Sequence, residues 1–178
     1  MSRNDVTIKV DLKSDGDPPE FVLTPIPPLP KFNSKKNDFA FYNEGEDGFL
    51  LRFTLQGNAL GYCFPDDEDE ALYSALGTEC PKTAGQWEQF KANNVTDNNK
   101  TLVVINRNDY EAEFGYTLRV KKMVGGKTKW LPLDPGGLNK NGSTRLTEVS
   151  QLITVAVGAV AATVLVLLSF GLLKRKWR

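Results

Sequence analysis

The chain has 178 residues, in which 22 Lys and Arg balance 22 Asp and Glu, and it contains no histidine. Four of the basic residues fall in the last five positions, so the rest of the chain is mildly acidic, which argues against a nucleic-acid-binding protein. Histidine is the usual general base near neutral pH and the commonest metal ligand, so Ser-His or Cys-His nucleophile pairs and zinc or copper sites are not expected. No cofactor is predicted.

The first part of the chain has the pattern of β-strands. Apolar and polar residues alternate over residues 6–12, and a second short strand is expected at residues 20–23. Residues 24–30 contain four prolines, which predicts a polyproline-like connector or an edge strand, or alternatively a ligand for an SH3-type or WW-type groove. Residues 38–42 and 48–55 are expected to form a hairpin, because a turn-forming cluster lies between them.

Residues 56–100 predict an irregular insertion with two short helices. The acidic residues 66–70 suit the first turn of a helix that continues to residue 76. A capping box predicts a second short helix that covers residues 87–91. Residues 93–99 are polar and are expected to form a loop.

Strands are expected again after the insertion. Residues 101–107 are apolar on both faces, which predicts a central strand, and residues 114–121 alternate with their even-numbered apolar residues facing inward. A glycine turn then leads to a last strand at residues 128–133. Seven or so short strands predict a mainly β fold, an antiparallel immunoglobulin-like sandwich over residues 1–133, followed by a linker at 134–151.

Two stretches carry a family resemblance. Residues 101–105 with 114–118, and residues 130–139 with Asp134-Pro135 and Asn139, resemble the small bacterial proteins of the DP-EP family. That family ends in an Asp-Pro, an Asn and then a Glu-Pro, and here Lys140-Asn141 stands at the Glu-Pro position. The resemblance covers residues 5–140; it implies a β-sandwich of uncharacterised role and carries over no active-site residue.

Aromatic residues gather in the insertion. A binding module could present them as a platform for sugar rings or a peptide, whereas the alternative is that they plug one end of the sandwich. The candidate binding residues are Tyr62, Phe64, Tyr73, Trp87 and Phe90.

The acidic run from Asp66 to Glu70 is the densest group of charges. An acidic helix start explains it, and the calcium-binding loop spacing of an EF-hand is absent. A glycosidase-like hydrolase that uses these carboxylates is the competing hypothesis for function. It would require two acids about 5 to 9 Å apart across a cleft, which neighbouring residues of one segment do not favour.

Cys63 and Cys80 are the only cysteines of the chain. In an oxidising compartment, a disulfide between them would close the loop that they bracket and contribute about 3 kcal/mol. In the cytosol they are expected to be reduced and half-buried.

The C-terminal part of the chain predicts a membrane anchor. Residues 152–173 contain no charge, and as a helix they would extend about 33 Å, enough to cross a hydrocarbon core of about 30 Å. The predicted anchor runs from Leu152 to Leu173, and its basic tail comprises Lys174, Arg175, Lys176, Trp177 and Arg178. Gly158 and Ala162 are four residues apart, a spacing of small residues that lets membrane helices pack closely, so a second copy or another membrane protein could pack there.

Two arguments oppose each other on the side of the membrane on which the domain lies, and the cytosolic side is favoured, because moving a domain of about 150 residues across without a signal is the harder requirement. The N-terminal residues lack the apolar core of a secretory signal, which favours a tail-anchored protein with its domain in the cytosol. The excess of basic residues after the predicted span favours the opposite orientation. The leading hypothesis is a non-enzymatic, single-pass membrane protein that binds something at the membrane surface or is an accessory subunit of a membrane complex, with the lipid bilayer as its partner.

Overall fold

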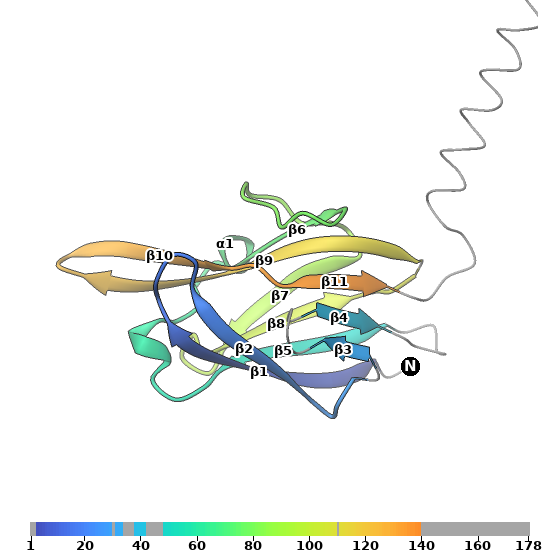
Figure 1. The fold of residues 1–178 in the computed structure, drawn as a ribbon, viewed down its shortest axis with the longest axis horizontal. Coiled ribbons are helices and arrows are strands. Elements are labelled where there is room, and N and C mark those ends of the chain that lie inside the picture. Colours follow the sequence, from blue (N-terminus) through green and yellow to red (C-terminus); the bar gives the residue numbers. More distant parts are fainter. Residues whose placement is uncertain (1–2, 30, 34–37, 42–47, 110, 140–178) are drawn as a thin grey trace, which may run out of the picture. The chain divides into compact units, whose positions relative to one another are not determined.

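A computed structural model describes residues 3–29, 31–33, 38–41, 48–109 and 111–139. The chain divides into two compact units, Met1–Ser143 and Thr144–Arg178, and all described residues belong to the first. This unit is mainly β, with two sheets packed face to face as in a sandwich (Figure 1).

The first sheet has the strand order β2-β1-β5-β8-β7. Its strands are β1 (Asn4–Ser14), β2 (Glu20–Ile26), β5 (Phe49–Leu55), β7 (Phe90–Thr96) and β8 (Thr101–Asn106). The second sheet has the order β10-β9-β11-β4-β3, and β6 pairs with the other edge of β9. Its strands are β3 (Lys31–Asn33), β4 (Asp38–Phe41), β6 (Leu72–Leu76), β9 (Ala112–Val124), β10 (Lys127–Leu133) and β11 (Gly136–Asn139).

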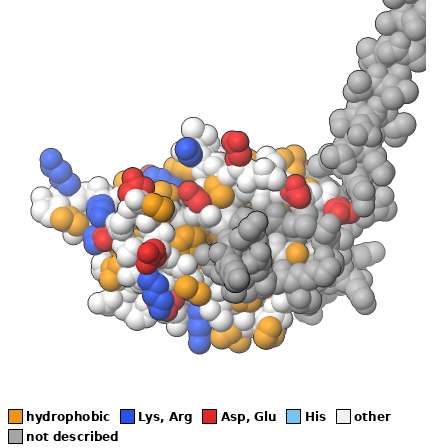
Figure 2. Space-filling view, in the orientation of Figure 1, with side chains coloured by type: hydrophobic (Ala, Val, Ile, Leu, Met, Phe, Trp, Pro, Cys, Tyr) orange, Lys and Arg blue, Asp and Glu red, His pale blue; other side chains and the backbone are white. Residues whose placement is uncertain are grey.

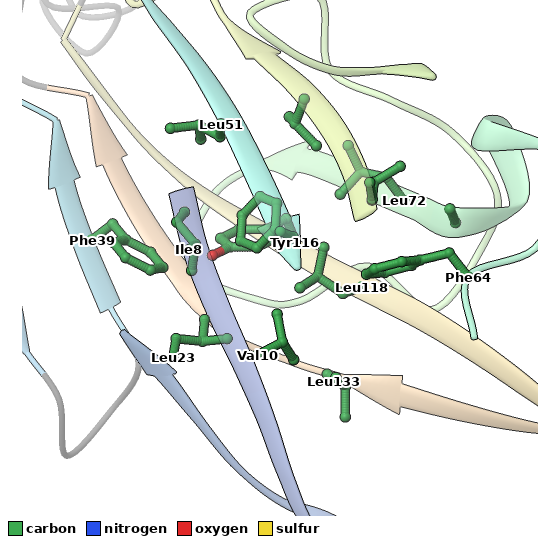
Figure 3. Packing of buried hydrophobic residues seen from close by; sticks show 14 of the residues in the cluster. Ile8, Val10, Leu23, Phe39, Leu51, Phe64, Leu72, Tyr116, Leu118 and Leu133 are labelled. Atoms are coloured by element: carbon green, nitrogen blue, oxygen red, sulfur yellow. The ribbon is translucent and has the colours of Figure 1, made fainter. Parts of the chain in front are cut away.

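The core lies between the two sheets. The predicted inward face of β9 is confirmed, because Phe114, Tyr116, Leu118 and Val120 are all buried. Alternate residues of β1 and β5 are buried against them, as expected for strands with one face on a core. Figure 3 shows this packing, in which side chains of β1 lie close to those of β9 and β10.

Two positional predictions for the first sheet are confirmed. β8 pairs with both β5 and β7 and is therefore internal. β2 pairs only with β1 among the described residues, so Pro25 lies on an edge strand, where the missing N–H costs no ladder bond to a further strand.

The expectation of a purely antiparallel sandwich is wrong, because β1 pairs in parallel with β5 and β11 pairs in parallel with β4. The predicted hairpin of residues 38–42 and 48–55 is also wrong. β4 joins the second sheet and β5 joins the first, so the segment between β2 and β5 crosses from one sheet to the other and back. A turn-forming cluster predicts only that the chain reverses direction. It does not predict whether the two flanking strands join the same sheet.

The two predicted helices are largely replaced by strands. Helix α1 is limited to Glu68–Ala71, and the next five residues form β6 on the edge of β9. Residues 87–91 form no helix, and Phe90 begins β7, which continues through most of the predicted loop at 93–99. A 3₁₀ turn, η1, occupies Ala59–Gly61. Pairing with an unfilled strand edge outweighs weak helix propensity in such short segments.

The prediction that a linker begins at residue 134 is wrong, because the first residues of this segment contain a strand, β11. β11 pairs with β9 through Gly136–Gly115 and with β4 through Gly137–Phe39, so the sheet continues to Asn139. The glycines that suggested a loop are tolerated because partner strands on both sides supply the hydrogen bonds.

Candidate binding surface

The predicted aromatic platform is mostly core. Tyr62, Phe64 and Phe90 have no exposed surface, and Trp87 is nearly buried. The Phe90 ring centre lies 4.7 Å from that of Phe114 in the opposite sheet. These four side chains therefore cannot present a surface to a ligand, and they fill the interior instead. Phe90 begins β7, whereas Tyr62, Phe64 and Trp87 lie in the connecting segments between strands, and all four side chains join the hydrophobic core.

Tyr73 is the exception among the five. It follows the buried Leu72 in β6, so it lies on the outer face of the second sheet, where it pairs with Thr117 of β9. Arg119, two residues further along β9, stacks on it with the guanidinium carbon 4.6 Å from the ring centre. The same carbon lies 4.2 Å from the ring centre of Trp130 in β10. Sequence reasoning missed this stack, because the three residues come from three different strands.

The stack continues toward the turn between β9 and β10. Lys121 pairs with Trp130, and Met123 pairs with Thr128, so all of these side chains share the outer face. Met123 is 67% exposed, the highest value among the large apolar residues described. We call Tyr73, Arg119, Lys121, Met123 and Trp130 the outer strip. The β9–β10 hairpin that carries most of it projects beyond the rest of the domain, and basic and apolar side chains are both visible at its end (Figures 1 and 2).

Acidic residues border the outer strip. The Lys121 ammonium lies 3.3 Å from a carboxylate oxygen of Asp66, whose side chain is 83% exposed. A hydrogen bond from Asn99, and then the contact with Lys121, lower the pKa of Asp66. Arg119 donates to the backbone carbonyl of Glu70 at 3.2 Å, so the acidic segment is fixed alongside β9.

The acidic run has local structural roles, as its simpler interpretation predicts. Asp67 caps α1 by accepting from the Asp69 N–H at 2.9 Å, and Asp69 accepts from the Gln86 amide at 2.9 Å. Within the described part of the chain, no three Cys, Asp or Glu residues converge as a metal site would require. A shallow hollow of about 450 Å³ lies beside this segment, lined by Asp69, Ala84, Gly85, Gln86, Lys91 and Ala92.

A charged junction holds the hairpin from its other face. Asp15, in the turn after β1, accepts from Lys122 at 2.8 Å, from Lys129 at 3.0 Å and from the Tyr62 hydroxyl at 3.1 Å. The bond from Lys122, followed by those from Lys129 and Tyr62, holds the pKa of Asp15 well below its ordinary 3.8. The Lys122 ammonium also lies 4.4 Å from the centre of the Tyr62 ring. This junction fixes the hairpin against the first sheet and leaves the outer strip facing away.

The two cysteines are not joined by a disulfide. The Cys63 thiol donates to the carbonyl of Lys121 at 3.6 Å, and the Cys80 thiol donates to the carbonyl of Pro135 at 3.2 Å. Both are half-buried, as expected for reduced cysteines of a folded domain. The structure thus corresponds to the reduced alternative of the two that the sequence left open.

The predicted anchor, Leu152 to Leu173 with its tail from Lys174 to Arg178, lies outside the described residues, as do Gly158 and Ala162. Among the helices of the described part, none combines the length and the apolar character needed to cross a bilayer.

No protein-family model matches the chain, and no curated protein matches it.

Proposed function

We propose that the chain is a single-pass, membrane-anchored binding or accessory protein without catalytic activity, which presents an immunoglobulin-like sandwich at the membrane surface. The uncharged run of residues 152–173 carries this proposal. A helix of this length matches the hydrocarbon thickness, and the basic tail with Trp177 suits the headgroup region that follows.

The outer strip is the surface that we assign to binding. Four of its five residues, Tyr73, Arg119, Met123 and Trp130, belong to types that are enriched at protein interfaces, whereas Lys121 belongs to a type that is depleted there. The Asp15 junction positions the hairpin without using the outer face, so the strip is available to a partner. The hydrolase hypothesis receives less support, because Asp67 and Asp69 are engaged in bonds that shape their own segment.

Membrane attachment can be tested with the full chain expressed in cells. Membranes are washed with alkaline carbonate, and the chain is expected to remain in the pellet. A variant with Val160→Asp and Val164→Asp interrupts the apolar run and is expected to be released, because an Asp near the centre of a span costs about 3 kcal/mol. Release of the unaltered chain, or retention of the variant, would contradict the anchor.

The side on which the domain lies can be determined in the same preparation. Sealed vesicles of known orientation are treated with trypsin, which is expected to cut at the exposed Lys127 of the hairpin only from the side that holds the domain. The tail-anchor interpretation requires cleavage from the cytosolic side. Protection there, with cleavage from the other side, would place the binding surface among extracytoplasmic partners.

A further inference from the structure

We propose that the partner of the outer strip is a second copy of this chain, bound face to face about a two-fold axis. The inference deepens the proposed function and rests on it, because it names the occupant of the surface that we assign to binding. Two observations support the second copy as partner: the arrangement of charge on that surface, and the apolar side chains between the charges.

The surface contains both halves of a complementary pair side by side. Arg119 and Lys121 form its basic side, and the segment that contains Asp66 and Glu70 forms its acidic side, with Lys121 and Asp66 in contact at 3.3 Å. A two-fold interface uses the same patch on both chains, so the patch must be complementary to itself. Rotating one copy by 180° over another brings each basic side onto the acidic side of its partner.

The surface also contains apolar side chains that a two-fold interface would bury. Met123 is 67% exposed, and Trp130 and Tyr73 are half-buried on either side of Arg119. These side chains stand on the same outer face of β6, β9 and β10. Val22 and Ile26 are also exposed, but they lie on β2, at the edge of the first sheet.

Charge also favours a second copy over an anionic lipid surface. The acidic segment at 66–70 borders the strip and would repel anionic headgroups as the basic residues attract them. Confinement of two copies to one bilayer would raise their effective concentration, as a linker does for tethered modules.

Complementary charge reversal tests the proposal directly. Two variants of the full chain are prepared, Lys121→Asp and Asp66→Lys, and each is purified in non-ionic detergent. The unaltered chain is expected to show a concentration-dependent monomer–dimer equilibrium in sedimentation velocity. Each variant alone brings like charges together twice in the two-fold pair, and its dimer is expected to be weakened about tenfold or more.

The two variants mixed together are the decisive sample. In a mixed pair, the carboxylate introduced at position 121 of one chain faces the ammonium introduced at position 66 of the other, and the native opposite charges face each other at the second contact. The mixture is expected to recover dimers that neither variant forms alone. This result separates a contact between chains from the Lys121–Asp66 contact within one chain, which both variants lose.

Matched substitutions on the first sheet serve as controls. The pair Asp11 and Lys13 lies on β1, and its reversals, Asp11→Lys and Lys13→Asp, are expected to leave the dimer unchanged. Met123→Asp is expected to weaken the dimer, whereas Val22→Asp, also on an exposed apolar residue, is not.

Two results would overturn the proposal outright: a monomer at all concentrations, or no recovery of dimers in the mixture. Dimers lost only in a Gly158→Leu/Ala162→Leu variant would assign association to the predicted span, which also overturns it.

The experiments distinguish a failure of the proposed membrane anchor from a failure of the proposed dimer interface. A chain that is released by carbonate yet recovers dimers in the mixture would refute the anchor and keep the interface. A chain that stays in the membrane as a monomer would keep the anchor and refute the interface. Flotation with vesicles containing anionic lipid, together with a monomeric state in detergent, would replace the second copy by a lipid surface.

Discussion

Replacing Phe90 by Ala separates the two roles that the sequence allows for the aromatic residues of the insertion. If Phe90 belonged to an exposed platform, its loss would affect binding and leave the fold intact. In the structure the ring is completely buried, with ring centres at 4.7 Å from Phe114 and 4.9 Å from Tyr116. The substitution should therefore act on stability.

The expected cost follows from the burial of the ring. A buried Phe replaced by Ala typically costs about 3–5 kcal/mol, which combines the lost transfer free energy with the cavity that remains. The Phe90 ring packs against two aromatic rings, and the Ser74 hydroxyl also fixes the backbone by donating to the Phe90 carbonyl at 2.6 Å, so little relaxation is expected. We therefore expect a loss in the upper half of that range.

Urea unfolding of the full chain in non-ionic detergent, followed by pulse proteolysis, measures this loss. With an m-value of about 2 kcal/mol per molar urea, the midpoint of Phe90→Ala should fall by about 2 M. Phe90→Leu, which keeps most of the apolar volume, should lower it by less than half of that amount. Tyr73→Ala serves as the comparison on the outer face and should cost about 1 kcal/mol.

A midpoint for Phe90→Ala within experimental error of the unaltered chain would refute the assignment of this ring to the core. Equal losses for Phe90→Ala and Tyr73→Ala would refute the distinction between the inner and outer faces of the insertion, on which the outer strip depends.

Three further predictions concern the turns and loops of the domain. Gly115→Ala should destabilise the chain by about 1–3 kcal/mol, because a Cβ at this position would lie 2.0 Å from the Glu79 carbonyl oxygen. Displacement of the segment that contains Glu79 should also speed trypsin cleavage at Lys82, which is exposed. Gly16→Ala, with no contact under 3.7 Å, is the control, and equal protease resistance of both variants would contradict the close approach. Asp15→Asn should lower the urea midpoint at neutral pH and have less effect as the pH falls from about 5. A carboxyl whose pKa is depressed on folding stabilises the fold above its unfolded pKa and loses that contribution when it is protonated. A difference in midpoint that does not depend on pH would refute the Asp15 junction. Alkylation of the chain unfolded without reductant should add two groups per molecule, as intact mass would show, since Cys63 and Cys80 are thiols; no addition would mean that they are oxidised to a disulfide.

The short-range patterns of the sequence predicted the parts of the fold that depend on neighbouring residues alone. The inward face of β9 and the glycine turn after it follow from alternation and from the preference of glycine for positive φ, which Gly125 and Gly126 both adopt. The edge position of β2 follows from its proline. The predicted anchor likewise depends only on the uncharged length of residues 152–173, so tertiary contacts are not needed to infer it.

Tertiary structure alone decided which strands pair and which side chains of residues 56–100 are buried. Leu72–Leu76 became a strand because the edge of β9 was available. β1 lies parallel to β5 in the first sheet, while β3 and β4, which come between them in the chain, joined the second sheet. The stack of Arg119 between Tyr73 and Trp130, and the contact of Lys129 with Asp15, join residues far apart in the chain. Such contacts depend on sheet register, which the local sequence does not specify, because many pairings satisfy the same alternation of apolar and polar residues.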